Sequence, residues 1–549
     1  MICVQIRIIR TDREVHVLSQ TVSENTFNVL VSDPVSSEGL APLLAIPNIR
    51  VIERSLEEIE HPLPAIRALI VRSATQVTEE ALKKLPGLQL IGRAGVGTDN
   101  IDIEAATRKG IIVINAPDGN TISTCEHTFA MMMALLRKIP QAHLSVKEGE
   151  WTRKKFEGTE LYGKHLGIIG FGRIGTEIAS RAKAFRMNVT VYDPFLTSER
   201  AEKAGVKSGD LTEVLSHADI LTIHTPLTKE TRGLIGQEAL HVMKTGAYLL
   251  NCARGGIVDE EALAGAVREG RIGGAALDVF ENEPLLQSPL RDADNIILTP
   301  HIAASTREAQ LSVARQVSEE IIAFSQGKSV THALNYPHIP GEQVKKVRPF
   351  YDLAEKMGRM SSIFMQIPVK EITVTYSGEV AEQDTSLLTR AALKGFFRNR
   401  VDSYVNDVNA TYIARQRDVS WTEKRTQEES GYQSLITIRA EGEDHSFSLT
   451  GTSNRDFGIR FIKIDHFSAD FQPSDHQLFI SHTDKPGVIG SVGQLLGSHG
   501  VNIATMQVGR RTEGGEAMMM LTVDKEVADE TVRGLQQVSE INRVTVIEL

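Results

Sequence analysis

Three side chains suited to oxidising an alcohol follow apolar segments in the middle of the chain: Arg254, Glu283 and His301. A histidine is the usual general base near neutral pH, and a nearby carboxylate holds its ring in one tautomer. A guanidinium binds a carboxylate at two points. We therefore predict that His301 removes a hydroxyl proton, Glu283 supports it, and Arg254 anchors a carboxylate. Each residue taken alone also fits an ordinary loop or surface position.

A hydride acceptor is predicted from residues 163–194, GKHLGIIGFGRIGTEIASRAKAFRMNVTVYDP. An apolar strand leads into a glycine motif, a helix follows, and a second strand ends at an acid. Gly170 suits the tight turn, Gly172 the approach of a diphosphate, and Gly175 the packing of helix on strand. Asp193 lies 18 residues beyond Gly175, where an acid binds the adenosine ribose and repels a 2′-phosphate. The predicted cofactor is therefore NAD.

Alternating apolar runs and helical segments surround this motif, which is typical of an α/β fold with parallel sheets. The glycine-rich loop at 92–102 either brings backbone to a small ligand or forms a tight turn. After the motif, four polar residues each come just beyond a predicted strand: Arg254, Asp278, Glu283 and His301. Because ligands lie beyond the carboxyl ends of parallel strands, we expect these residues to share one site.

The α/β rhythm stops near Pro337, and two further units follow. Residues 341–470 combine predicted helices at 348–357 and 386–398 with scattered strands. Residues 477–549 show a short βαββαβ pattern, which predicts a ferredoxin-like domain.

Composition narrows the possible partners and compartment. The 549 residues carry a net charge of −10, and they contain no basic block that would indicate nucleic-acid binding. No apolar run reaches the roughly 18 residues of a membrane span. The three cysteines have neither paired nor metal-like spacing. We therefore expect a cytoplasmic protein of several domains, with no metal, nucleic-acid or membrane partner.

Six motifs, in this order, resemble the D-2-hydroxyacid dehydrogenases: GRAGVGTDNID, GFGRIG, HTPL, NCARGG, ALDVFENEP and PHIAAST. The resemblance implies an α/β fold in which a Rossmann-type NAD domain is inserted in a flavodoxin-like substrate domain. An α+β intervening domain and a ferredoxin-like ACT domain would follow. The implied division is an N-terminal extension at 1–25, a substrate domain at 26–123 and 307–335, an NAD domain at 124–306, an intervening domain at 341–470 and an ACT domain at 476–549.

The resemblance also assigns site residues. The family's catalytic Arg, Glu and His fall on Arg254, Glu283 and His301. Cofactor contacts would come from Gly170, Gly172, Arg173, Ile174, Gly175, Asp193, Thr225, Cys252, Ala253 and Asp278. Substrate contacts would come from Arg72, Ser73, Arg93, Gly95, Val96 and, reaching a neighbouring subunit, Arg137.

The segment HTDKPGVIGSVGQLLGSHGVNIATMQVGR is the characteristic part of the ACT resemblance. His482, Asp484 and Asn502 match positions that hold L-serine in some relatives. The alternative is an ACT domain that only dimerises. In the intervening domain, Arg439 and Arg460 are candidates for binding an anion.

Long family members with this domain order imply oxidation of 3-phospho-D-glycerate to 3-phosphooxypyruvate with NAD. That reaction is the first step of L-serine biosynthesis. A homo-oligomer, expected to be a tetramer, would be regulated by L-serine. Two alternatives stay open: a different acid, such as glyoxylate or hydroxypyruvate, handled on the same scaffold, or a non-catalytic protein that senses NAD or an amino acid.

Overall fold

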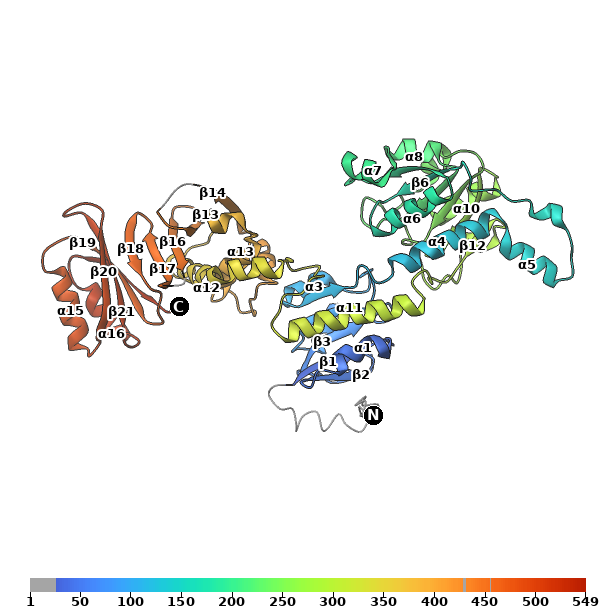
Figure 1. The fold of residues 1–549 in the computed structure, drawn as a ribbon. Coiled ribbons are helices and arrows are strands. Elements are labelled where there is room, and N and C mark those ends of the chain that lie inside the picture. The colour runs from blue at the N-terminus through green and yellow to red at the C-terminus, as the bar shows by residue number, and fades with distance from the viewer. Residues whose placement is uncertain (1–25, 428–430, 455) are drawn as a thin grey trace.

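The computed structural model describes residues 26–427, 431–454 and 456–549, so the extension expected at 1–25 lies outside the described residues. Four sheets follow one another along the described chain (Figure 1). The first two are wholly parallel and the last is wholly antiparallel. The mixed α/β class expected from the sequence is confirmed. No helix in the described part is both long enough and apolar enough to cross a membrane.

The first sheet has the order β2-β1-β3-β4-β5, which is the flavodoxin-like order. Its strands are β1 (Phe27–Val31), β2 (Ile49–Glu53), β3 (Ile66–Val71), β4 (Leu90–Arg93) and β5 (Ile112–Asn115). Its helices are α1 (Ser37–Leu44), α2 (Glu79–Lys83) and α3 (Ile103–Arg108). The central strand β3 is apolar almost throughout and buried from Ala68 to Val71, as a parallel strand covered on both faces requires.

The second sheet has the order β12-β11-β10-β9-β6-β7-β8. Its strands are β6 (His165–Ile169), β7 (Asn188–Tyr192), β8 (Lys207–Ser208), β9 (Ile220–Ile223), β10 (Ala247–Asn251), β11 (Ile272–Leu277) and β12 (Ile296–Leu298). Helices α6 (Arg173–Ala184), α7 (Ser198–Ala204), α8 (Leu211–His217), α9 (Gln237–Val242) and α10 (Glu260–Arg268) connect them. The chain reverses its direction across the sheet between β6 and β9, which is where a Rossmann fold binds its ligand.

Two helices join these sheets. Helix α4 (Thr121–Leu136) leads into the second unit, and α11 (Arg307–Ser325) returns to the first (Figure 1). Helix α11 packs closely on α1, because a methyl group at Gly39 would lie 2.4 Å from the Cβ of Ala314. The second unit is therefore an insertion within the first. Between α4 and β6, an arm carries α5 (Ile139–Lys147) and the short helix η2 (Arg153–Phe156).

The third sheet, β14-β13-β15-β16-β17-β18, belongs to the intervening unit. Its strands are β13 (Glu371–Gly378), β14 (Ser420–Thr426), β15 (Ser434–Glu441), β16 (Ser446–Asn454), β17 (Gly458–Ile464) and β18 (Phe467–Phe471). Its helices are α12 (Gly341–Phe364), α13 (Ser386–Phe397) and α14 (Ala410–Gln416). The helix expected at 348–357 is much longer: it runs through Pro349, and its apolar face continues to Phe364.

The fourth sheet, β20-β21-β19-β22, has the ferredoxin-like arrangement expected for the tail. Its elements are β19 (Gln477–Thr483), α15 (Val488–Ser498), β20 (Ile503–Arg510), β21 (Glu516–Val523), α16 (Asp529–Gln536) and β22 (Ile541–Ile547). The end of α12 packs on this unit. Phe364 stacks on Phe447 with ring centroids 4.5 Å apart and meets Phe479 edge-on at 4.9 Å. Arg359 donates to the carbonyl of Glu548 at 3.1 Å.

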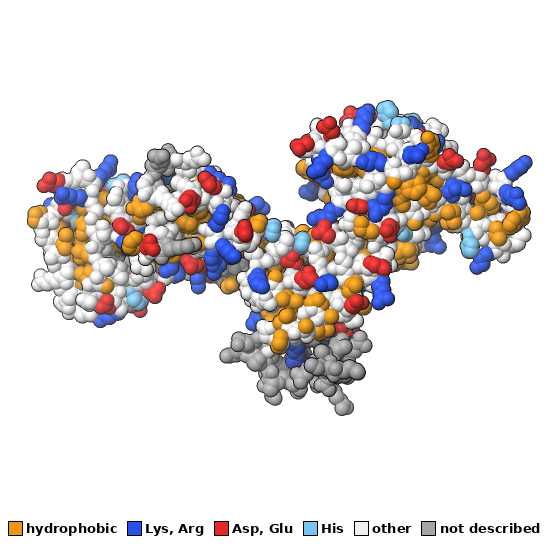
Figure 2. All heavy atoms as spheres, in the orientation of Figure 1, with side chains coloured by type: hydrophobic (Ala, Val, Ile, Leu, Met, Phe, Trp, Pro, Cys, Tyr) orange, Lys and Arg blue, Asp and Glu red, His pale blue; other side chains and the backbone are white. Residues whose placement is uncertain are grey.

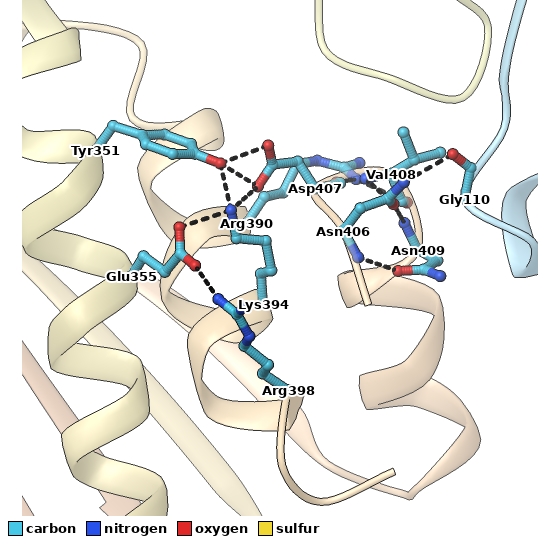
Figure 3. A network of polar contacts seen from close by, with 10 residues as sticks. All are labelled: Gly110, Tyr351, Glu355, Arg390, Lys394, Arg398, Asn406, Asp407, Val408 and Asn409. Atoms are coloured by element: carbon cyan, nitrogen blue, oxygen red, sulfur yellow. Dashed lines mark hydrogen bonds and ion pairs between the residues drawn. The ribbon is translucent and has the colours of Figure 1, made fainter. Parts of the chain in front are cut away.

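The intervening unit also contacts the substrate domain (Figure 3). Asn406 donates to the carbonyl of Gly110 at 2.8 Å, and Asn409 donates to that of Arg108 at 3.3 Å. Val408 is buried in the apolar core of the substrate domain. The loop 406–409 is thereby fixed to the turn between α3 and β5.

A half-enclosed charge network supports this loop (Figure 3). Lys394 lies 2.7 Å from a carboxylate oxygen of Glu355 and 3.7 Å from one of Asp407. It also donates to the hydroxyl of Tyr351 at 2.7 Å, and that hydroxyl donates to Asp407. The side chain of Lys394 is only 17% exposed. Removing its charge would leave Asp407 without an ion-pair partner among the described residues and Glu355 with Arg398 alone, at 3.4 Å.

We expect Lys394→Met to destabilise the intervening unit by about 3 kcal/mol, because Asp407 loses its cation and Glu355 keeps only the exposed Arg398. Urea unfolding followed by the fluorescence of Trp421, in a Trp151→Phe background, measures the loss. The matched control is Lys370→Met, which removes an exposed partner of Glu443 and should change stability by less than about 0.5 kcal/mol. Equal effects of the two substitutions would contradict the role assigned to the network.

Candidate active site

The turn that carries His301 folds around the carboxylate of Asp278, which is fully buried. Thr299 donates its hydroxyl to Asp278 at 2.6 Å, and the N–H groups of Ile302 and Ala303 donate at 2.8 Å each. Burial raises the pKa of Asp278, but these hydrogen bonds and one from His127 outweigh it, so the pKa lies below its usual value. Asp278 is therefore an anion that fixes the backbone on both sides of His301.

His301 projects from this turn toward Glu283. Its backbone is left-handed, with φ at 52°, and its Nδ1 lies 2.7 Å from Oε2 of Glu283. The other oxygen of Glu283 accepts the N–H of Phe280 at 3.0 Å. Burial raises the pKa of Glu283, but the hydrogen bonds from His301 and Phe280 bring it below its usual value. The carboxylate thus holds the imidazole by Nδ1 and leaves Nε2 free for a substrate proton.

Arg254 follows β10 and reaches the substrate domain. Its Nε donates to Asp99 at 2.9 Å and its Nη1 to the carbonyl of Ala253 at 2.7 Å. Its Nη2 lies against the glycine-rich loop, since a methyl group at Gly97 would be 1.8 Å away. Asn251 donates to the carbonyl of Arg254 at 2.9 Å and so fixes the turn.

A second guanidinium lies against the same loop. A methyl group at Gly95 would be 1.5 Å from Nη1 of Arg93, so both arginines need glycine beside them. Burial, together with the positive charges of Arg254 and Arg72, lowers the pKa of Arg93 to about 10. The Nε of Arg93 is buried without a hydrogen-bond partner among the described residues. Two guanidinium groups therefore lie against the loop, and one of them, that of Arg93, keeps an unused donor.

The loop itself is tied to β5. Asn115 donates to the carbonyl of Val96 at 2.6 Å, and the N–H of Ala116 donates to that of Gly95 at 3.0 Å. Ser73 is exposed beside Arg72. Arg137 ends α4, about 24 Å along the helix from its start, and does not join the other predicted substrate residues in this chain.

The glycine motif fits a dinucleotide. A methyl group at Gly170, whose φ is 94°, would lie 2.5 Å from the carbonyl oxygen of His224, and one at Gly175 would lie 2.2 Å from that of Gly170. Gly172 faces open space and is the N-cap residue of α6, and no side chain caps the helix there. The free N–H groups of the first turn can therefore receive a diphosphate. A diphosphate can approach the backbone here, because among the described residues no atom beyond the adjacent residues lies within 4 Å of the position of a Cβ on Gly172.

Other predicted cofactor residues surround the same end of the sheet. Asp193, at the end of β7, accepts the N–H groups of Phe171 at 2.7 Å and Phe195 at 2.8 Å, which orients its carboxylate. The hydroxyl of Thr225 is buried without a partner among the described residues, so it can still bind a ligand. Ile174, Cys252 and Ala253 lie at the start of α6 or just beyond β10. These features suit NAD, and the described residues contain no cluster that could hold a metal ion.

Sequence reasoning missed Asp99 and Asp118 as site residues. Asp99 pairs with Arg254, and Asp118 pairs with Arg173 at 2.5 Å. Both partners come from the other domain, so no local pattern revealed them. Only the position of Asp99 within the GVGTDNID segment could have indicated a role.

The structure separates the three residues predicted to bind serine. His482 is buried beside Asp484, and its Nε2 has no partner among the described residues. Asn502 precedes β20 at the opposite end of the sheet, about 20 Å away by strand length, and donates to Asp524. One chain therefore cannot bring all three together. Arg439 and Arg460 pair with Glu441 and Asp470, and an anion site at these arginines stays a prediction.

Three family matches cover most of the chain. Residues 129–303 match the D-isomer specific 2-hydroxyacid dehydrogenase NAD binding domain. Residues 346–465 match the D-3-phosphoglycerate dehydrogenase intervening domain, and residues 476–540 match the ACT domain.

Similar proteins agree with these matches. D-3-phosphoglycerate dehydrogenase of Bacillus subtilis is 50% identical, over 95% of this chain and 100% of its own length. The enzyme of the same name from Archaeoglobus fulgidus is 44% identical over the same shares. Among solved structures, the TT0316 protein of Thermus thermophilus covers 56% of this chain and 100% of its own, with a TM-score of 0.52 and 32% identity. A glyoxylate reductase from Paecilomyes thermophila covers 57% and 99%, with a TM-score of 0.51 and 28% identity.

His224 should make the stability of the NAD domain depend on pH. Burial lowers the pKa of its imidazole to about 3, whereas in the unfolded chain the value is about 6.5. Between these values the unfolded state binds the extra proton, so the free energy of unfolding falls as pH falls. We expect His224 to lower the free energy of unfolding by up to about 2 kcal/mol when the pH falls from 6.5 to 5.

Denaturant unfolding at pH 7 and pH 5 measures this loss, and His224→Asn should reduce it. The exposed His217 of the same domain supplies the control, His217→Asn, which should lose as much stability as the wild type. An undiminished loss in His224→Asn would show that the buried imidazole is not responsible.

Proposed function

The chain belongs to the D-3-phosphoglycerate dehydrogenases, within the D-2-hydroxyacid dehydrogenase family, and we propose that Arg254, Glu283 and His301 carry out its reaction. It oxidises 3-phospho-D-glycerate to 3-phosphooxypyruvate with NAD, the first step of L-serine biosynthesis. The observation that supports the residue assignment is the 2.7 Å contact between His301 and Glu283, beyond the same edge of the sheet from which Arg254 extends to Asp99.

In this mechanism the guanidinium of Arg254 binds the substrate carboxylate through two donors. Nε2 of His301 accepts the proton of the adjacent hydroxyl group, and Glu283 stabilises the imidazolium that forms. The C–H bond of the same carbon breaks with its electron pair, and a carbonyl group remains. NAD, when bound, supplies the acceptor for that hydride. Arg93 and Arg72 add positive charge for the phosphate group.

L-serine regulates the enzyme in our proposal, at a site shared by two ACT domains. His482 and Asp484 of one chain would meet Asn502 of a second, since a single chain keeps them apart.

L-serine should therefore suppress NADH formation by the wild type but not by Asn502→Ala. Inhibition that survives this substitution would remove the shared site.

The arm between α4 and β6 supports a homo-oligomer, which we propose is a tetramer. Figure 2 shows hydrophobic side chains gathered on this arm. Ile139, Leu144, Val146 and Trp151 are each more than half exposed. Patches of this kind mark protein interfaces, and Arg137 at the base of the arm would then reach a neighbouring site. We also place the enzyme in the cytoplasm, which its unpaired Cys125 and Cys252 support.

A substrate panel tests the function. The wild type should form NADH from 3-phospho-D-glycerate with a kcat/KM at least about 100-fold above that for D-glycerate, because the phosphate group meets the cluster of cations. Arg93→Met should lower the value for the phosphorylated substrate far more than the value for D-glycerate.

The control is Arg108→Met, which removes an exposed arginine of the same domain and should change neither value. Equal kcat/KM values for the two acids in the wild type would favour a general hydroxyacid dehydrogenase. NAD binding without turnover would favour a sensor.

A further inference from the structure

Two ion pairs cross the cleft between the substrate and NAD domains. Asp99, just beyond β4, accepts from Nε of Arg254 at 2.9 Å. Asp118, just beyond β5, accepts from Nε of Arg173 at 2.5 Å. In both pairs the acid belongs to the substrate domain and the arginine to the NAD domain.

Each arginine is one that the proposed function assigns to a ligand anion. Arg254 binds the carboxylate of the substrate, and Arg173, the first residue of α6, lies where the diphosphate of NAD would bind. Asp99 and Asp118 thus offer carboxylates to the same guanidinium groups that the ligands need. An arginine cannot give the same N–H donor to both partners at full strength.

Both ion pairs are exposed enough for a ligand anion to replace the aspartate at its arginine. The side chains of Asp99 and Asp118 are 64% and 56% exposed. Each carboxylate can therefore rotate into the solvent when a ligand anion binds its arginine. Exposed ion pairs contribute only about 0–1 kcal/mol, whereas a buried pair would be costly to break. A ligand anion that binds an arginine at two points can therefore displace either acid.

Neighbouring acids hold backbone N–H groups, whereas Asp99 contacts Arg254, and Asp118 contacts Arg173 and, at 4.0 Å, His332. Asp33 accepts the N–H groups of Arg72 and Thr75, and Asp102 caps α3. Asp99 instead pairs with Arg254, one of the two guanidinium groups that lie against the glycine-rich loop. Burial and the positive charge of Arg254 lower the pKa of Arg93.

We propose that Asp99 and Asp118 are placeholder carboxylates. Each pairs with an arginine of the NAD domain and directs it toward the substrate domain. On binding, the carboxylate of the substrate takes Arg254 from Asp99, and the diphosphate of NAD takes Arg173 from Asp118. Both acids are positioning residues, because they act on the ligands through an arginine. The proposal rests on the proposed function for the substrate and on the NAD site for the cofactor.

Two variants of the full-length enzyme separate the two exchanges. Asp99→Asn removes a competitor for Arg254 and should lower the KM for 3-phospho-D-glycerate about three-fold, with the Kd for NAD changed less than two-fold. Asp118→Asn should lower the Kd for NAD, measured by calorimetry without substrate, about three-fold, with the KM for the substrate changed less than two-fold. Asp99→Ser, which also removes the charge, should reproduce the result of Asp99→Asn.

The control is Glu79→Gln, which breaks an ion pair with Arg108 on the substrate domain outside the cleft and should shift neither constant. A higher KM in Asp99→Asn would overturn the proposal, because it would mean that Asp99 orients Arg254 for the substrate. Equal shifts of both constants in each variant would also overturn it, since a general charge effect explains them. If the wild type does not oxidise 3-phospho-D-glycerate, the proposed function fails, while calorimetry with NAD still tests Asp118.

Discussion

The buried carboxylate of Asp278 is the constraint on which the geometry of the site depends. An ionised group enclosed by protein is tolerated only when its lone pairs are filled, and here a hydroxyl and two backbone N–H groups fill them. All three donors come from the turn between Thr299 and Ala303. To supply them, the chain must wrap around Asp278, and His301 is directed outward with a left-handed backbone. The position of the base thus follows from the need to satisfy an acid beneath it.

The other catalytic groups are fixed by the ends of parallel strands. β10 leads to Arg254, β11 leads to Asp278, and β12 leads to the turn of His301. The substrate domain meets them with a loop whose glycines leave room for two guanidinium groups. The reaction requires both domains, because the base and the carboxylate anchor lie on one and most of the charge for the phosphate lies on the other. Two ion pairs, Asp99 with Arg254 and Asp118 with Arg173, join the two domains.

Local sequence patterns predicted the parts of the molecule that local chemistry determines. The glycine motif, the acid after β7 and the polar residues beyond the strands of the second sheet were all evident, because each depends on spacing within a short segment. The full length of α12 was not, since its apolar face is defined by packing on both the third and the fourth sheets. β14 and β16 were not anticipated either, because one is largely polar and exposed and the other mixes small polar residues with few apolar ones.

Long-range pairs were beyond the reach of such patterns. Asp99 and Arg254 are 155 residues apart, and Asn406 and Gly110 are 296 residues apart. The separation of Asn502 from His482 likewise depends on strand register, which sequence spacing does not fix. The residues proposed to perform the reaction could thus be named from the sequence, whereas their partners across domain boundaries could not.

The most direct test of the central claim is the rate of hydride transfer in a single turnover. Enzyme saturated with NAD would be mixed with 3-phospho-D-glycerate, and NADH absorbance would be followed for the wild type and for His301→Gln. Our account predicts transfer slowed by at least about 100-fold in the variant, with the Kd for NAD unchanged. An unchanged rate of hydride transfer in His301→Gln would show that the pair formed by His301 and Glu283 is not the catalytic base.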